Sequence, residues 1–92
     1  MAILATPPLI EKWANNIQVT EPVNGSWIEA IAKKYKAPEV TGDRLADIAI
    51  KLGVDLNSST GDHYHDICIA LGNNNPLNGS YLARIVQITT PA

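Results

Sequence analysis

Hydrophobic residues recur along this chain in short groups that have the spacing of one face of an α-helix. Within each group they occupy positions 0, 3, 4 and 7, which form a single stripe on an amphipathic helix. The groups are Ile10/Trp13/Ala14/Ile17, Ile28/Ile31/Ala32/Tyr35, Leu45/Ile48/Ala49/Leu52, Tyr64/Ile67/Cys68/Leu71 and Leu82/Ile85/Val86, the last followed by Ile88 or Thr89. The pattern predicts five helices, near residues 8–17, 26–35, 43–52, 62–71 and 80–88.

The polar residues that precede each group also repeat. Four copies begin with a glycine, and the four glycines are 17, 19 and 18 residues apart. Each glycine is followed by a residue whose side chain commonly caps a helix N-terminus: Ser26, Asp43, Asp62 and Ser80. The first copy has Pro7 and Pro8 instead, and the fixed φ of proline suits the opening turn of a helix. A period of about 18 residues indicates tandem structural units.

Helices of about ten residues are marginally stable alone in water, so each apolar stripe must be buried against other copies. We therefore expect an all-α fold in which five helices pack as a small array or bundle, with residues 1–92 forming one domain. Gly53 and Gly72 follow two of the stripes, where glycine commonly ends a helix. The connectors are long enough to run back along a helix, so parallel and antiparallel stacking both remain open.

Composition and charge exclude several classes of function. The net charge is −2 and there is no run of basic residues, which disfavours a broad surface for nucleic-acid phosphates. Residues 1–6 lack a charged n-region and a long apolar segment, so we expect no signal peptide and no membrane span. The single cysteine, Cys68, excludes an internal disulfide and occupies a stripe position typical of a small core residue.

One segment concentrates residue types that bind metals, namely Asp62, His63, His65, Asp66 and Cys68. On a helix, His63 and His65 point about 200° apart, so they cannot bind one metal from the same face. Pairs three residues apart would supply two ligands, whereas zinc needs three or four. Because the repeat explains Asp62 as a cap and Cys68 as a core residue, we expect no metal and no cofactor. A metal-dependent domain is the alternative.

Residue types that serve in catalysis are also present, including Ser26, Ser80, Asp43 and Asp47. However, the sequence contains no Gly-x-Ser-x-Gly motif and no phosphate-binding glycine loop. No base is placed against a nucleophile by its position in the sequence. We therefore expect a protein that is not an enzyme.

Residues 45–54 are similar to the first half of a helix-turn-helix, with Ala49 and Gly53 in the characteristic relation. A recognition helix should then begin within a few residues. Residues 55–61 are instead a polar loop, and the helix predicted after them carries no arginine or lysine. Because of these departures from the motif, a helix-turn-helix-like DNA-binding regulator is only the alternative function.

One position in each copy is a candidate for partner binding. It lies between the cap and the stripe and is occupied by Leu9, Trp27, Arg44, His63 and Tyr81. In a stacked array these residues would line one surface rich in Trp, Tyr and Arg, which are enriched at binding hot spots. We predict that Trp27, Arg44, His63 and Tyr81 bind a partner. The alternative is that the aromatic rings cover the edge of the core.

Residues 20–32, TEPVNGSWIEAIA, resemble tandem helical repeats in structural proteins of tailed bacteriophages, where units of the type EPVNGSW(I/L)xxIA recur. The likeness fades in the later copies, where Arg44, His63 or Tyr81 replaces Trp27. The resemblance implies a non-enzymatic virion component in many copies, such as a capsid decoration, neck or tail/baseplate protein, assembled in the host cytoplasm. Its partners would be protein subunits, both identical and different, and neither nucleic acid nor membrane.

Overall fold

The computed structural model describes residues 8–91 of the chain. It contains five α-helices: α1 (Leu9–Asn16), α2 (Trp27–Lys34), α3 (Arg44–Lys51), α4 (His63–Ala70) and α5 (Tyr81–Thr89). The all-α prediction is confirmed, and each helix begins one residue after its predicted start because the predicted ranges included the cap. A short 3-10 helix, η1 (Leu56–Ser58), lies in the α3–α4 connector, where the pattern predicted only a loop.

None of the helices in residues 8–91 has the length and apolar character needed to cross a membrane. The prediction that no signal peptide is present concerns residues 1–6, which lie outside the described part of the chain.

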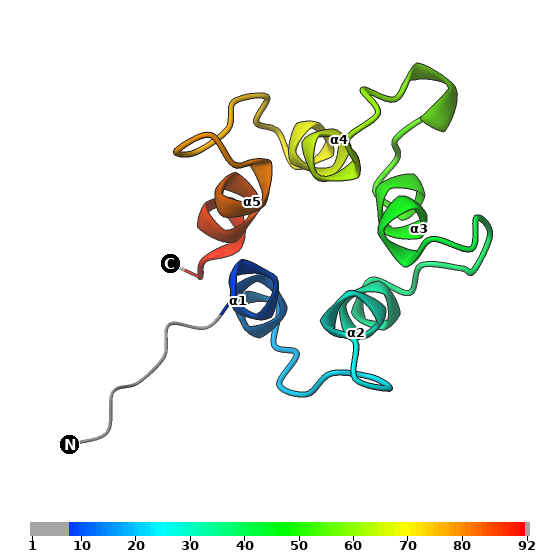
Figure 1. Cartoon of the computed structure of the whole chain (residues 1–92), viewed down its shortest axis with the longest axis vertical. Helices are drawn as coiled ribbons and strands as arrows, with labels where there is room; N and C mark the ends of the chain where they lie inside the picture. The colour runs from blue at the N-terminus through cyan, green and yellow to red at the C-terminus, as the bar shows by residue number, and fades with distance from the viewer. Residues whose placement is uncertain (1–7, 92) are drawn as a thin grey trace.

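The five helices stand side by side in a closed ring, which Figure 1 shows from one end. Each helix packs against the next one in the sequence, and α5 returns to pack against α1. The connectors pass around the outside of the ring. The array of repeats is therefore closed.

All five helices point in the same direction. The decisive contacts join the start of one helix to the start of its neighbour, or the end to the end. They link Glu29 with Arg44, Asp43 with His63, His65 with Tyr81, and Asn16 with Thr89. Because four of the five junctions are parallel in this way, the fifth, between α1 and α2, must be parallel too. Of the two arrangements left open by the sequence, the parallel one is correct, and each connector returns along the full length of a helix.

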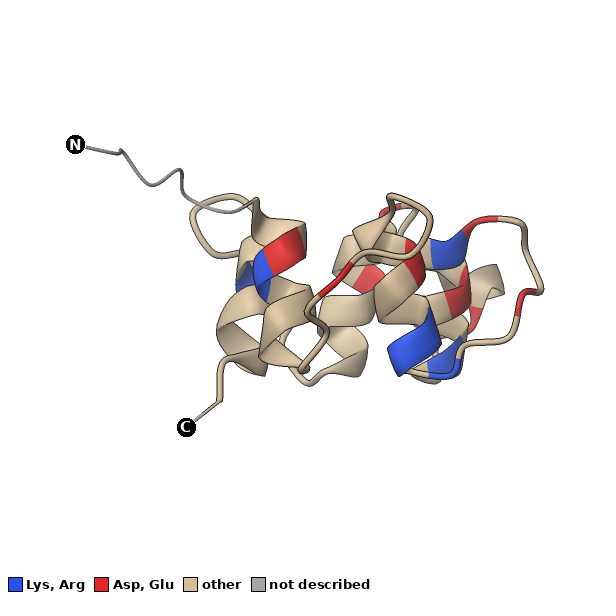
Figure 2. Ribbon diagram, turned by 90° about the horizontal axis from the view of Figure 1, so that it is seen from below, with Lys and Arg blue, Asp and Glu red and all other residues tan. Residues whose placement is uncertain are grey.

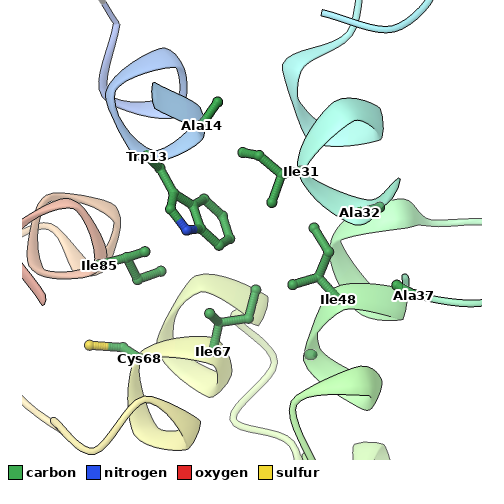
Figure 3. Packing of buried hydrophobic residues seen from close by; sticks show 10 residues of the cluster. Trp13, Ala14, Ile31, Ala32, Ala37, Ile48, Ile67, Cys68 and Ile85 are labelled. Atoms are coloured by element: carbon green, nitrogen blue, oxygen red, sulfur yellow. The ribbon is translucent and has the colours of Figure 1, made fainter. Parts of the chain in front are cut away.

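One repeat position fills the centre of the ring. The fifth residue of every helix is fully buried, and Figure 3 shows these side chains converging from the five helices: Trp13, Ile31, Ile48, Ile67 and Ile85. The Trp13 indole donates a hydrogen bond of 3.3 Å to the Tyr35 hydroxyl. The residue after each of these is small, so neighbouring helices approach closely. The other stripe residues pack around this centre and are half-buried.

The helix ends follow the predicted signals. The side chains of Ser26, Asp43, Asp62 and Ser80 accept hydrogen bonds from backbone amides in the first turn. Pro8 precedes α1 without a side-chain cap. Gly53 and Gly72 end α3 and α4 with a φ of +100°, and the amide of the following residue bonds back to the helix. The equivalent residues after α1 and α2, Gln18 and Lys36, adopt the same left-handed conformation without being glycine.

Candidate interaction surfaces

The predicted partner-binding residues lie at the end of the ring where the helices begin. We call this end the N-terminal rim, made of the four caps and the residue after each of them. Trp27, Arg44, His63 and Tyr81 are all half-buried on this rim. Trp27 and Tyr81 pack against the hydrophobic core, and the other two contact the preceding helix. These contacts fit the alternative in which the residues cover the edge of the core. The partner-binding role remains a prediction.

Arg44 uses its guanidinium within the chain. Its Nε donates to Glu29 of α2 at 2.9 Å, its Nη1 donates to Asp47 at 3.0 Å, and its Nη2 donates to the Ala37 carbonyl at 3.1 Å. The side chain is only 16% exposed. Arg44 therefore joins α2 to α3 and presents little donor capacity to a partner.

The two histidines contact different neighbours. His63 lies between two carboxylates, with Nδ1 at 3.6 Å from Asp66 and Nε2 at 3.9 Å from Asp43. The His65 ring stacks on Tyr81 with centroids 3.9 Å apart, and its Nε2 lies 2.6 Å from the Asn74 side-chain oxygen. Nowhere in residues 8–91 do three His, Cys, Asp or Glu side chains gather as a metal site.

Cys68 follows Ile67 along α4 and is fully buried in the core, as its stripe position predicted. Burial raises the pKa of its thiol, and the charge of Arg84 only partly opposes this effect. The thiol is therefore kept in its neutral and less nucleophilic form.

Two buried carboxylates hold the connectors before α3 and α4. Asp47 accepts hydrogen bonds from the Thr41 hydroxyl at 2.8 Å and the Thr41 amide at 2.9 Å. Asp66 does the same with Thr60, at 2.9 Å and 3.0 Å. Both copies share the pattern Thr-Gly-Asp-x-x-x-Asp, at residues 41–47 and 60–66, which the sequence analysis did not single out. The second aspartate of the pattern is a structural residue.

These two aspartates should make the stability of the protein depend on pH. Burial acts to raise their pKa, but hydrogen bonds from Thr41 to Asp47, and from Ser59 and Thr60 to Asp66, outweigh it and lower both pKa values. Their stabilising effect is present above the unfolded-state pKa of about 3.9 and is lost as the pH falls through the lower folded-state pKa.

We therefore expect the free energy of unfolding, measured by urea titration, to fall steeply below about pH 4. Substituting both residues with asparagine should lower stability at neutral pH and flatten this acid dependence. An unchanged pH dependence in the Asp47→Asn/Asp66→Asn variant would contradict this role of the two carboxylates.

A surface cleft of about 250 Å³ opens outside the ring between α3 and α4. Its apolar lining comes from Leu52, Val54, Ile69 and Ala70, and Asp55 adds a carboxylate. Ile69 is 43% exposed, although isoleucine is among the residue types most often buried. The cleft therefore combines an exposed apolar side chain with an acidic edge.

No protein-family model matches the chain, no curated protein is significantly similar to it, and no solved structure matches its fold.

The five copies of the repeat provide a reference for Ile69 within the chain. The residues equivalent to Ile69 are Asn15 in α1, Lys33 in α2, Ile50 in α3 and Gln87 in α5. Since polar residues occupy this position in three copies, the ring does not require an apolar residue there.

Proposed function

We propose that this protein is a non-enzymatic interaction module that serves in many copies in a tailed-phage virion, as a capsid decoration, neck or tail/baseplate component. The observation that supports an interaction role best is the exposed Ile69 beside the α3–α4 cleft, at a position where the fold accepts polar residues. With Leu52, Val54 and Ala70 of the cleft, Ile69 forms one contiguous apolar surface. A contiguous exposed apolar surface, unlike a single exposed residue, is typical of a protein-binding site. The phage setting rests on the resemblance of residues 20–32.

The charge around the cleft specifies the chemistry of the partner. The residues that line the cleft include Asp55 and Asp66 and no lysine or arginine. Asp55 is exposed, whereas Asp66 is buried. Complementary charge favours a partner segment that places an apolar side chain in the cleft beside a lysine or arginine. We propose that a neighbouring protein of the assembly supplies such a segment.

Residues of catalytic type have structural roles in this fold, which supports a function without chemistry. The hydroxyls of Ser26 and Ser80 and the carboxylate of Asp43 cap helices. Asp47 holds the connector before α3 and also binds Arg44. These groups are already engaged by hydrogen bonds within the chain.

The packing of α3 and α4 favours the interaction module over the DNA-binding alternative. The two helices of a helix-turn-helix cross at about 90–120°, whereas α3 and α4 lie parallel in the ring. In addition, α4 has no arginine or lysine to contact phosphates. Titration with mixed duplex DNA at low salt separates the two functions. Roughly micromolar binding with a steep salt dependence would support the regulator.

We expect Ile69→Gln to reduce the number of copies in purified particles several-fold, because the partner loses an apolar contact in the cleft. Glutamine occupies the same position in α5, so the ring should fold normally, as circular dichroism would verify. The matched control is Val40→Gln, which alters the other large hydrophobic residue that is strongly exposed among residues 8–91. Quantitative mass spectrometry of particles assembled with each variant gives the measurement.

If Ile69→Gln were incorporated at the wild-type level, the cleft would not be the surface that contacts the partner. If the wild-type protein were absent from particles, the virion role would be rejected. The same assay with Trp27→Ala and Tyr81→Ala tests the predicted partner-binding residues of the N-terminal rim. If that rim binds the partner, these variants should incorporate poorly while keeping their helical content.

A further inference from the structure

The two ends of the ring carry opposite charge. We call the end where the helices finish the C-terminal rim, and it presents four exposed lysines at the ends of α2 and α3: Lys33, Lys34, Lys36 and Lys51. The N-terminal rim presents exposed carboxylates at the starts of α3 and α4, from Asp43 and Asp62, with Glu39 in the connector before α3. In the side view of Figure 2, blue stretches gather at the lower edge of the ring on the right, and red stretches lie above them together with a further blue stretch.

This separation of charge depends on the parallel packing of the helices. Acidic residues favour helix starts and basic residues favour helix ends because of the helix dipole. In an antiparallel bundle these preferences would mix both signs at each end. Because all five helices point the same way, the preferences add, and the molecule has one acidic and one basic end. The acids and lysines also share one sector of the ring, formed by α2, α3 and α4.

Each rim also has apolar side chains inside its charged edge. Trp27 and Tyr81 are half-buried on the N-terminal rim, and Tyr35, Leu52 and Leu71 are half-buried at the C-terminal rim. An apolar centre surrounded by polar groups is the usual anatomy of a protein interface. The four connectors between the helices of residues 8–91 pass outside the ring, so none of them covers either end (Figure 1).

We propose that copies of this chain stack head to tail, with the C-terminal rim of one copy against the N-terminal rim of the next. In this arrangement lysines meet carboxylates, and the negative end of each helix dipole faces the positive end of another. Stacking start to start or end to end would bring like charges together. A contact between two different surfaces of the same chain does not close by itself, so it produces an open stack.

This inference rests on the proposed function because it names a second copy of the chain as one of the partners in the assembly. We expect the average mass in sedimentation or light scattering to rise with protein concentration at about 0.01 M salt, where the screening length is about 30 Å. At about 1 M salt, where the screening length is about 3 Å, the stacks should dissociate. A wild-type protein that stays monomeric at every concentration at low salt would overturn the proposal.

Two variants test the polarity of the stack. Lys33→Glu/Lys34→Glu cancels the charge of the basic rim, because two glutamates then face the remaining Lys36 and Lys51. Asp43→Ser/Asp62→Ser removes both carboxylates at the helix starts and keeps a capping side chain of the kind that Ser26 provides. Each variant alone should stay monomeric, with normal circular dichroism. An equal mixture should form dimers and nothing larger, since only one rim of each variant is intact. The control Lys12→Glu changes a charge in the middle of α1 and should stack like the wild type.

Dimers or larger species formed by either variant alone would overturn the head-to-tail arrangement, as would a mixture that stays monomeric. The outcome is separable from that of the proposed function. A chain that never stacks but enters particles in an Ile69-dependent way would reject the stack and keep the interaction module. A chain that stacks but is absent from particles would keep the stack and reject the virion role.

Discussion

Replacing Trp13 with alanine is expected to remove a large part of the stability of the protein. Trp13 is fully buried and occupies, in α1, the central position that isoleucine fills in the other four helices. A buried tryptophan replaced by alanine typically costs about 3–5 kcal/mol, because the core loses contacts and keeps a cavity. A domain of this size has a free energy of unfolding of about 5–15 kcal/mol. The hydroxyl of Tyr35 also loses its donor.

Chemical denaturation followed by circular dichroism provides the measurement. The central isoleucine of α3 is a useful comparison, since Ile48→Ala should cost about 2–5 kcal/mol. The other tryptophan, Trp27, is half-buried on the N-terminal rim, so Trp27→Ala should cost less than Trp13→Ala. A loss of unfolding free energy well below 1 kcal/mol for Trp13→Ala, or for Ile48→Ala, would mean that the residues at the centre of the ring are not the core of the protein.

Removing α5 is expected to abolish cooperative folding. In an open array of repeats each unit contacts only its neighbours, so the loss of a terminal unit leaves the remaining stack intact. Here α5 contacts both α4 and α1, and Asn16 of α1 donates to the Val86 carbonyl of α5 at 2.9 Å. A chain ending at residue 76 would open the ring and expose the central residues of all the remaining helices. We expect it to lack a sharp thermal transition and to bind a hydrophobic dye.

A circular permutant is the matched control for this truncation. It joins the end of α5 to the start of α1 through a linker like residues 72–78 and opens the chain within η1. All five helices are retained, so the permutant should unfold cooperatively, as the parent does. If the truncated chain unfolded as sharply as the parent, closure of the ring would not be needed for folding.

The helices could be predicted from the sequence because their signals are local. Each stripe, cap and terminal glycine lies within one copy of the repeat, and Gly53 and Gly72 end their helices as expected. Direction and closure were not predictable, since connectors of this length permit both directions. They depend on contacts between copies, such as Arg44 with Glu29 and Asn16 with Thr89.

The candidate surfaces could be predicted only in part for the same reason. The repeat gives Trp27, Arg44, His63 and Tyr81 the same position in their helices, but they share one edge only because the helices are parallel, which the sequence left open. Their partial burial does not follow from the repeat either, because it arises where the first turns of parallel neighbours meet. Ile69 is visible in the sequence as an apolar residue at a position that is polar in three of the other four copies, but its exposure follows only from the ring.

The closed centre also limits how this protein could have grown in evolution. An open solenoid lengthens by gene duplication, because an added unit extends the stack without disturbing the others. In this ring five side chains, one of them the tryptophan Trp13, fill a centre of fixed width. A sixth unit would widen the ring and leave a hole on its axis. New sequence is therefore best accommodated in the peripheral connectors, one of which already holds the short helix η1.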